Sequence, residues 1–428
     1  RGLGDVYKRQ DFDSQYRGLM DAGITFAQKF NLRPGIALSP NQVAQLTADI
    51  VWLESEQVTL PNGKVENVLV PKVYALAKKG DITGNGTLLS GNKVIHKGGE
   101  FINSGTVAGR ELVQFDSESI RNSGNISGGA IVGKVSGDME NVGGTIEADR
   151  AILLNVAGNF NHTSQTHTTS VNEQGYQRTD TTIGRKGLLH VKGENGTLQI
   201  QANNITLAGA DIINDGQGQT YLSAKNNLNL TALSVGFDEK MGGGNHYRNE
   251  AVQSVEVSRV QGKGDVVLSG QNIYSEAAQL EAKQRLALLA ENDVVLGTAS
   301  TSSDYAEYHH TKSGGAFGSS KKTTLDTYQD KTQVGTTLGG GEILVSAGND
   351  LKAQNLQAIA DKDLSLQAVN NVSISADTNY FKETHFEQKS KSGVFSGGGI
   401  GITFGKKSET HESEAEGWQQ SQARSTLG

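Results

Sequence analysis

A nineteen-residue repeat dominates the chain between residues 77 and 160. Four hydrophobic residues recur at this interval, and each opens a five-residue motif that ends in glycine, as in Phe101-Ile-Asn-Ser-Gly. These residues are Ile82, Phe101, Ile120 and Met139. A unit this short cannot bury its own apolar side chains, so it is stable only when stacked on its neighbours. The repeat therefore predicts a parallel β-solenoid whose coils lie about 4.8 Å apart.

Two more apolar rows keep the same interval. One row is Leu88, Val107 and Ile126, and the other is Val94, Val113 and Val132. The additional glycine at Gly143–Gly144 moves the next members to Ile146 and Ile152. Three inward rows per coil predict an all-β protein, a right-handed parallel β-helix with 19-residue coils over residues 77–160.

Three asparagines form a fourth row. Asn103, Asn122 and Asn141 follow the first apolar row by two residues and repeat at the same interval. Asparagine tolerates the left-handed backbone conformation of a corner, and its amide can hydrogen-bond to the copy one coil away. We therefore predict a structural asparagine ladder. The alternative is that the three are ordinary turn residues exposed to solvent.

Composition supports a continuous β ladder. The 428 residues include 54 glycines but only 4 prolines, and none follows Pro71, which suits strands that must all donate their N–H groups. Cysteine is absent, which excludes disulfides and thiolate metal sites. The net charge of −7 comes without a basic stripe, so nucleic acid is not an expected partner. We find no apolar run of membrane-spanning length and no signal-peptide pattern.

The segment of residues 11–76 has the pattern of a small α+β unit. Ser39-Pro40 at a predicted helix start is followed by an apolar stripe, which comprises Val43, Leu46, Ile50 and Leu53. A shorter helix is expected over Leu19–Phe30. Asn62-Gly63 between the β-prone runs Gln57–Leu60 and Val65–Val70 predicts a hairpin. We expect this unit to cap one end of the solenoid, whereas residues 1–10 show no pattern and are left unassigned.

Solenoid-like segments with a second signature return over residues 161–376. Each copy has a hydrophobe, a small residue two positions later, and another hydrophobe after a polar step. The copies are Leu222–Ala224–Leu228, Leu268–Gly270–Ile273, Leu288–Ala290–Val294, Val345–Ala347–Leu351 and Leu366–Ala368–Val372. Polar insertions interrupt them near residues 161–187, 235–264 and 300–341, and residues 377–428 form another hairpin-like insert and a charged tail. We predict hairpins that project from one face of the solenoid.

Several segments resemble a family of large bacterial exoproteins. They are Phe26–Leu38, Gln45–Leu53 and Val68–Tyr74, followed by the repeats and by the inserts around Tyr305–Phe317 and Phe381–Phe404. These segments are similar to the filamentous-haemagglutinin type of two-partner secretion exoprotein. Within that type they are similar to the toxin-delivering proteins of contact-dependent growth inhibition.

The resemblance implies a secreted protein on the surface of a Gram-negative bacterium. It implies an outer-membrane transporter as partner, engaged by an N-terminal domain outside this sequence, and a C-terminal toxin delivered to neighbouring bacteria. The chain is expected to be an internal fragment, the β-helical stalk that carries haemagglutinin repeats. In toxin-delivering members this block is thought to act at the target cell's outer membrane or receptor. The alternative function is a filamentous adhesin that attaches to host cells or matrix.

Residues capable of catalysis are scattered, so we predict no enzyme and no catalytic, metal or cofactor site. His309 and His310 are the only adjacent histidines, and neighbours on a strand point to opposite faces, which disfavours shared metal binding. Four acidic residues occupy similar coil positions, and they are Asp265, Asp293, Glu342 and Asp350. Stacked carboxylates would repel each other, so solvated turns are expected there.

Two further motifs have simple structural interpretations. Gly397–Gly401 lacks the following helix that would hold a phosphate, so a turn is expected, and His411-Glu-Ser-Glu is expected to belong to a charged tail. The alternation of apolar and small residues in Ile400–Phe404 raises the hypothesis that the inserts bind a lipid bilayer. Adhesion to glycans and an enzyme that acts on polysaccharides are the remaining hypotheses.

Overall fold

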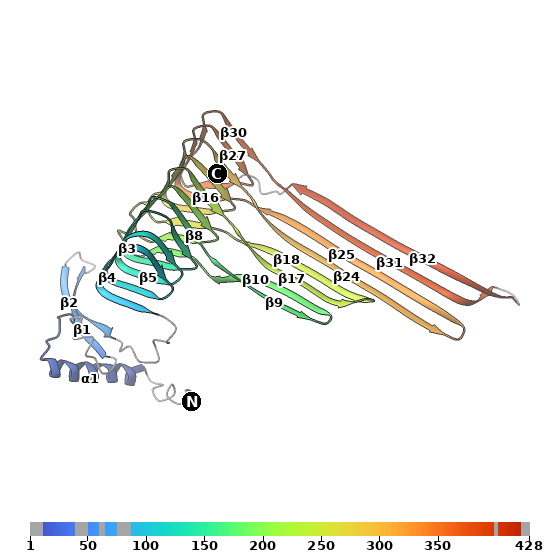
Figure 1. Ribbon diagram of the computed structural model, residues 1–428, viewed down its shortest axis with the longest axis horizontal. Coiled ribbons are helices and arrows are strands. Elements are labelled where there is room, and N and C mark those ends of the chain that lie inside the picture. The colour runs from blue at the N-terminus through green and yellow to red at the C-terminus, as the bar shows by residue number, and fades with distance from the viewer. Residues whose placement is uncertain (1–11, 39–49, 60–64, 75–86, 398–400, 421–428) are drawn as a thin grey trace. The chain divides into compact units, whose positions relative to one another are not determined.

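The chain divides into two units, residues 1–86 and residues 87–428. A computed structural model describes residues 12–38, 50–59, 65–74, 87–397 and 401–420 (Figure 1). These ranges contain one helix and 32 strands. The expectation of an all-β protein with a small α+β segment before the repeats is therefore confirmed.

The first unit packs one helix on one hairpin. Its elements are α1 (Phe12–Phe30), β1 (Ile50–Thr59) and β2 (Val65–Tyr74), and the two strands pair antiparallel. Phe26 of the helix, Ile50 and Trp52 form the centre of a small core. The Trp52 indole donates a 2.7 Å hydrogen bond to the carbonyl oxygen of Ile36. A side chain at Gly23 would collide with the backbone of β1, so the helix and the strand touch through their main chains.

Two of the four predictions for this unit are confirmed. The helix expected over Leu19–Phe30 exists and begins earlier, at Phe12, and the hairpin exists, although its turn lies outside the described residues. The helix predicted to start at Ser39-Pro40 is wrong at its C-terminal end, because Ile50 and Leu53 lie in β1, and its residues 39–49 lie outside the described residues. Pairing with β2 over ten residues outweighs a helical spacing of apolar side chains. The capping role remains a prediction.

The second unit is built of stacked coils. Between the first and the last coil, each strand pairs in parallel with the equivalent strands of the coils before and after it, within one sheet of 22 strands (Figure 1). Grouping the strands by these pairings gives ten coils. In order they are β3 (Leu88–Asn103); β4 (Thr106–Asn122); β5 (Asn125–Val135) and β6 (Met139–Val142); β7 (Thr145–Val156) and β8 (Asn159–Thr163); β11 (Leu188–Val191), β12 (Thr197–Ala202) and β13 (Asn204–Ala208); β14 (Asp211–Asn214), β15 (Thr220–Ala224) and β16 (Asn227–Thr231); β19 (Arg259–Gly262), β20 (Val266–Gly270) and β21 (Asn272–Glu276); β22 (Gln279–Ala290) and β23 (Val294–Gly297); β26 (Thr337–Ala347) and β27 (Asp350–Gln354); and β28 (Gln357–Ala360), β29 (Leu364–Ala368) and β30 (Asn371–Ser375).

The apolar rows form one continuous core inside the coils. Phe101 pairs with Ile120, Ile120 with Met139, and Met139 with Phe160. Ile120, Met139 and Phe160 are almost completely buried. Burying one such side chain contributes about 1.5–3 kcal/mol, so the row is a main source of cohesion. The first predicted member, Ile82, lies outside the described residues.

Two predicted row members are displaced by one residue. The partner of Val107 is Leu89 and not Leu88, and the partner of Val113 in the next coil is Ile131 and not Val132. The displacement arises at the first corner, where the ladder register shifts between successive coils. The corners differ in length from coil to coil, and a fixed interval of nineteen residues does not follow these differences. The later members Ile146 and Ile152 are at the predicted positions.

The second signature marks the same rows in later coils. Leu222, Leu268, Leu288, Val345 and Leu366 pair in sequence from coil to coil. The small residues of the signature also align, since Gly270 pairs with Ala290, Ala290 with Ala347, and Ala347 with Ala368. The repeats with the second signature therefore continue the core of the first block.

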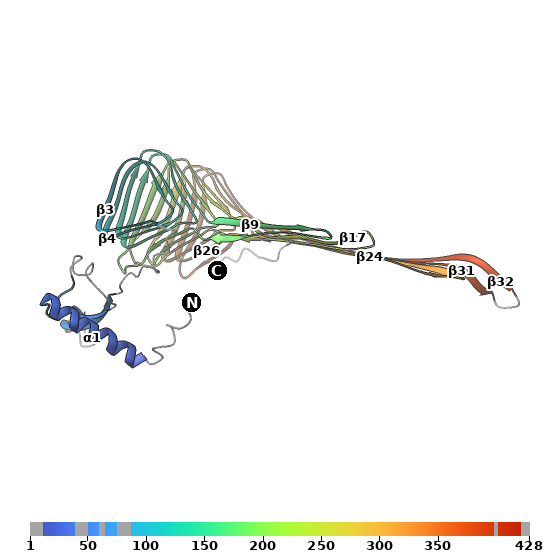
Figure 2. The ribbon, with the colours of Figure 1, turned by 60° about the horizontal axis from the view of Figure 1, so that its bottom comes forward.

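The polar insertions fold into four hairpins, as predicted. They are β9 (Gln165–Glu173) with β10 (Tyr176–Arg185); β17 (Leu233–Gly243) with β18 (His246–Glu256); β24 (Ala299–Gly315) with β25 (Gly318–Val334); and β31 (Thr378–Gly397) with β32 (Gly401–Gln420). Their eight strands pair side by side in one antiparallel sheet, which we call the hairpin sheet. Figure 2 shows it as a thin layer that leaves the coils on one side. The third insertion ends at Val334, because residues 337–341 already belong to the ninth coil.

Hairpins leave the coils at a fixed corner and at every second coil. They follow β8, β16, β23 and β30, which end the fourth, sixth, eighth and tenth coils. Adjacent strands in a sheet lie about 4.8 Å apart, so two coils and one two-stranded hairpin both occupy about 9.6 Å. This match allows every hairpin to pair with the preceding one while its base stays in its own coil.

The alternate coils close the same corner with a tight turn. Gly209, Ala277 and Asn355 stand at equivalent corners with φ of 55°, 55° and 49°. Each is followed by an apolar residue that is completely buried, namely Ala210, Ala278 and Leu356. A left-handed residue reverses the chain without an insertion, although it is costly for alanine. The corner residues therefore decide which coils carry a hairpin.

Candidate functional site

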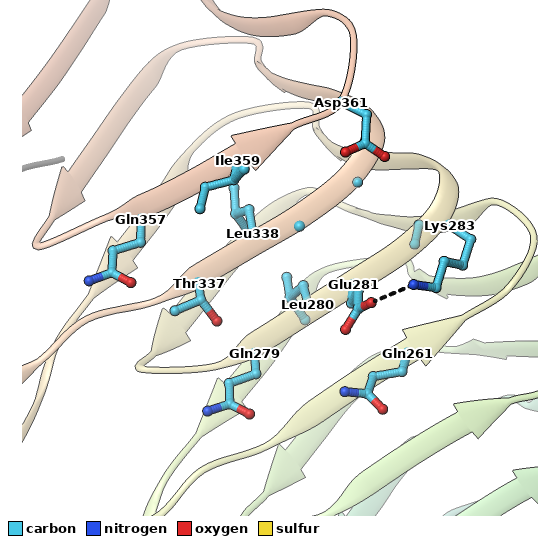
Figure 3. Close-up of a pocket in the computed structure, with 13 residues that line it drawn as sticks. Gln261, Gln279, Leu280, Glu281, Lys283, Thr337, Leu338, Gln357, Ile359 and Asp361 are labelled. Atoms are coloured by element: carbon cyan, nitrogen blue, oxygen red, sulfur yellow. Dashed lines mark ion pairs between the residues drawn. The ribbon is translucent and has the colours of Figure 1, made fainter. Parts of the chain in front are cut away.

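A hollow on the outer face of the last four coils is the best candidate for a site. Its volume is about 380 Å³, and its lining comes from β19, β22, β26 and β28 (Figure 3). These four strands lie side by side, because Gln261 pairs with Glu281, Glu281 with Gly339, and Gly339 with Ile359. A second outward row runs beside the first through Gln279, Thr337 and Gln357.

The hollow exists because glycine replaces a side chain in an outward row. A Cβ atom at Gly339 would have Glu281 Cγ as its nearest neighbour, at 3.6 Å, which is an ordinary contact. The next residue differs, since a Cβ at Gly340 would approach the carbonyl oxygen of Glu342 to 2.9 Å. The fold therefore explains Gly340, whereas nothing in the local packing requires glycine at 339.

The lining is polar and nearly neutral. Gln261, Gln279, Gln357 and Thr337 contribute amides and a hydroxyl, and Ile359 contributes an aliphatic surface that is 59% exposed. Glu281 at the rim pairs with Lys283 at 3.6 Å, and the two side chains are 50% and 71% exposed. The arrangement offers hydrogen bonds and one apolar contact to a bound molecule.

The adjacent histidines lie in the hairpin sheet and face different partners. The ring of His309 lies 4.0 Å from that of His246, and its Nε2 contacts Glu307 at 2.9 Å. The side chain of His310 bonds instead to Thr323, at 2.8 Å. The prediction that these neighbours point apart is confirmed. In the described ranges, no three His, Asp or Glu side chains are grouped so that they could hold a metal ion.

The four acidic residues do not form one row. Asp265 and Glu342 lie at the first corner, near Arg285 and Lys362 respectively, at 3.6 and 3.9 Å. Asp293 and Asp350 lie at the second corner, where Asp293 accepts hydrogen bonds from the Asn349 amide and from the Asp350 N–H. Their spacing in the sequence predicted similar positions in the coil. The coil has three corners, however, and these four residues lie at two of them.

The predicted asparagine ladder is present and buried. The Asn103 amide donates to Asn122 at 2.8 Å, and the Asn122 amide donates to Asn141 at 2.7 Å. Asn122 and Asn141 are completely buried, so the alternative of exposed turn residues is wrong. The expected left-handed backbone is also wrong, because none of the three has a positive φ. Their amides bond along the stack and to the corner carbonyl oxygens without it.

His162 ends the ladder where the first hairpin begins. Its Nδ1 accepts from the Asn141 amide at 3.0 Å, and its Nε2 donates to the carbonyl oxygen of Asp211 at 2.9 Å. Burial lowers the pKa of His162 to about 4, because the charged imidazolium would be desolvated there. The residue is therefore neutral near neutral pH and acts as one more member of the ladder.

A second ladder at another corner was missed by the sequence analysis. Asparagine amides donate from coil to coil, for example from Asn204 to Asn159 at 2.9 Å, from Asn272 to Asn227 at 3.0 Å and from Asn371 to Asp350 at 3.0 Å. The signal in the sequence is a pair of polar residues at the start of the last strand of a coil. These pairs are Asn203-Asn204, Asn226-Asn227, Gln271-Asn272, Asn292-Asp293, Asn349-Asp350 and Asn370-Asn371.

An ion network joins the first two hairpins. Glu239 is only 6% exposed and accepts hydrogen bonds from Tyr176, Arg178 and Arg248 at 3.1, 3.0 and 2.9 Å. Bonds from Arg248 and Arg178 hold the pKa of Glu239 below its ordinary value. Because the carboxylate bonds to residues of both hairpins, it fixes their register and is not free to act as a base.

The remaining motifs also belong to the hairpin sheet. Gly397 pairs with Gly401 at the end of the fourth hairpin, and the segment that follows is a strand, whereas residues 398–400 of the expected turn lie outside the described residues. His411 was expected in a charged tail, but it lies in β32 opposite Glu387. Alternating charged residues are compatible with an exposed strand, which explains the error.

Comparison with known proteins identifies the repeats. Residues 314–428 match the haemagglutinin repeat family. Over 97% of its length the chain is 30% identical to a toxin CdiA of Escherichia coli, and 29% identical both to a tRNA nuclease CdiA of Escherichia coli and to a 16S rRNA endonuclease CdiA of Enterobacter cloacae. It spans only 15%, 15% and 14% of those proteins. No solved structure matches the chain.

Stacked parallel coils with regularly inserted hairpins define a repeat protein whose elements are mainly structural. The haemagglutinin repeats at residues 314–428 and the CdiA relatives that align with 97% of the chain support a region of a filamentous-haemagglutinin-type exoprotein of contact-dependent growth inhibition. In the described ranges no helix combines the length and the apolar character needed to cross a bilayer.

Proposed function

We propose that this chain is a stalk segment that presents, or helps to deliver, a C-terminal toxin to neighbouring bacteria. The observation that carries the proposal is the alignment of 97% of the chain with proteins named as a toxin and as nucleases, of which it forms about a seventh. The aligned residues contain stacked coils and hairpins, which suit a spacer. The stalk itself is proposed to be non-enzymatic.

The stalk is proposed to be a right-handed parallel β-helix at the cell surface of a Gram-negative bacterium. Parallel pairing from coil to coil supports the β-helix, and ten coils at about 4.8 Å give a rod of roughly 45 Å. The proposed export partner is an outer-membrane two-partner secretion transporter. Each added coil buries further apolar surface, so folding outside the cell would favour forward movement of the chain during export.

A competition experiment tests the proposal. The complete exoprotein is expressed with and without residues 87–375, with surface display measured by immunolabelling. Removal of these residues is expected to abolish inhibition of target bacteria in co-culture. A producer that displays the shortened protein and inhibits targets as before would contradict the proposal. Unchanged inhibition with lost attachment to host cells would favour the adhesin.

The hairpins offer a narrower test of the same proposal. Their strands lengthen along the chain, from 9 and 10 residues in the first hairpin to 20 and 20 in the fourth. We propose that this growing sheet contacts the target cell, and truncating the third and fourth hairpins should then lower inhibition while display is retained. Flotation of the purified chain with liposomes distinguishes a lipid surface from a protein receptor.

A further inference from the structure

We propose that the hollow around Gly339 binds a neutral polysaccharide that lies along the axis of the coils. This inference concerns the outer surface of the stalk and does not depend on toxin delivery. It begins with Gly339 itself, because the backbone there would accept a side chain without strain. A glycine in an outward row of side chains leaves a recess. The backbone at residue 339 does not require glycine, so the fold alone does not account for this recess.

The recess is lined by groups that suit sugar hydroxyls. Each hydroxyl is both a donor and an acceptor, and a glutamine amide offers both functions in one plane. Gln261 and Gln357 make no side-chain hydrogen bond within the described part of the chain, and Gln279 accepts from Arg259 at 2.8 Å, which leaves its NH₂ group available. Ile359 adds an exposed aliphatic surface for the C–H face of a sugar ring.

Other ligand classes fit the recess less well. The backbones of Glu281 and Gly339 are paired on both sides within the parallel ladder, so an extended peptide cannot add as a new strand at the centre of the recess. The charge of Lys283 is compensated by Glu281, and Asp361 adds a negative charge at the rim, which disfavours an anionic polymer. The lining has no aromatic side chain on which a nucleic-acid base could stack.

The arrangement of the lining implies a polymer and not a single sugar. Gln261, Gln279, Thr337 and Gln357 belong to four successive coils. Coils about 4.8 Å apart distribute these side chains over roughly 14 Å along the axis. A chain of several sugar residues can contact all four, whereas one ring cannot.

Affinity electrophoresis tests the inference with the intact chain. Gels that contain dextran, mannan or galactan serve as neutral probes, and at least one should retard the wild-type protein. Gly339→Tyr should fill the recess, and the double variant Gln261→Ala with Gln357→Ala should remove two hydrogen-bonding groups. Each should weaken retardation about tenfold or more.

The matched control is Ser373→Tyr, which adds the same aromatic side chain to an exposed position in β30, outside the lining. It should migrate like the wild type in every gel. Circular dichroism verifies that each variant is folded, and the double glutamine variant decides the question if Gly339→Tyr is not. The inference is overturned if no neutral polymer retards the wild type, if both recess variants are retarded normally, or if only polyanions cause retardation.

Discussion

At the scale of single residues, buried hydrogen-bonding side chains define the corners of the coils. Asn103, Asn122, Asn141 and His162 form one column in which each amide satisfies its neighbour and a corner carbonyl oxygen. A buried polar group contributes little net stability when paired and is costly when its partner is lost. The column therefore specifies register more than it adds cohesion, and substitutions within it should be severe.

Replacement of Asn122 by alanine should destabilise the second unit by about 3 kcal/mol, because the Asn103 amide and the Asn141 carbonyl oxygen both lose a buried partner. The midpoint of urea unfolding measures the loss. Asn125→Ala is the control, since this asparagine is exposed only three residues away. Equal midpoints for the two variants would show that the ladder is dispensable.

His162 should make the stability of the second unit depend on pH. Its folded pKa of about 4 lies below the unfolded value near 6.5, so the unfolded chain binds more protons between these values. Stability is therefore fully present above pH 6.5 and decreases as the pH falls towards 4, by up to about 3 kcal/mol.

The variant His162→Asn tests this dependence, because asparagine can continue the ladder without titrating. The difference in unfolding midpoint between pH 7 and pH 4.5 should become smaller than in the wild type. His167→Asn, at an exposed position of β9, should leave that difference unchanged. A wild-type pH profile retained in His162→Asn would assign the dependence to other groups.

At the scale of elements, the spacing of coils and the width of hairpins are matched. Every hairpin occupies two strand positions and every pair of coils provides the same distance. The corners alternate accordingly between insertions and left-handed turns at Gly209, Ala277 and Asn355. Formation of the hairpin sheet therefore depends on the number of coils between hairpins as well as on the sequences of the hairpins.

Deletion of one coil should break the match between the spacing of the coils and the width of the hairpins. Removal of residues 259–278 leaves a single coil between the second and third hairpins, so their strands can no longer pair at the sheet spacing. Removal of residues 259–336 eliminates two coils together with the third hairpin, and the second and fourth hairpins remain two coils apart. Hydrogen exchange should show unprotected amides along the facing edges of β18 and β24 in the first variant, because these strands pair across the deleted spacing.

The larger deletion is the control for the smaller one. It removes more residues, yet amides of β17, β18, β31 and β32 should stay protected, because the spacing rule is kept. Similar protection of the hairpin strands in both variants would refute the coupling between coils and hairpins.

At the scale of the whole molecule, the second unit behaves as a one-dimensional stack. Each coil contacts only its neighbours, so cohesion is the sum of coil interfaces along one continuous apolar core. An interruption inside the stack divides it into two shorter stacks. Export that relies on sequential folding should therefore stop at such an interruption.

Replacement of Phe101, Ile120 and Met139 by serine should interrupt the stack, because one inward row loses its apolar surface over three coils. Surface display of the complete exoprotein, measured by immunolabelling, should fall several-fold. The control replaces the outward neighbours Ile102, Arg121 and Glu140 by serine. Normal display of the first variant would mean that coil formation does not assist export.

The sequence by itself determined the coils, because an inward side chain must recur once per coil and leaves a visible period. Phe101, Ile120 and Met139, the asparagine ladder and the polar insertions were all predicted in this way. The one-residue errors at Leu88 and Val132 arose where corner lengths vary.

The tertiary structure alone decided how the coils and hairpins combine. The pairing of hairpins distant in the sequence, the division of the acidic residues between two corners, and the recess at Gly339 leave no periodic trace. Each depends on which residues lie side by side after winding, and that neighbourhood is set by cumulative corner lengths. A local sequence pattern shows which side chains one coil must bury. Which side chains become neighbours on the surface is determined only by the folded stack.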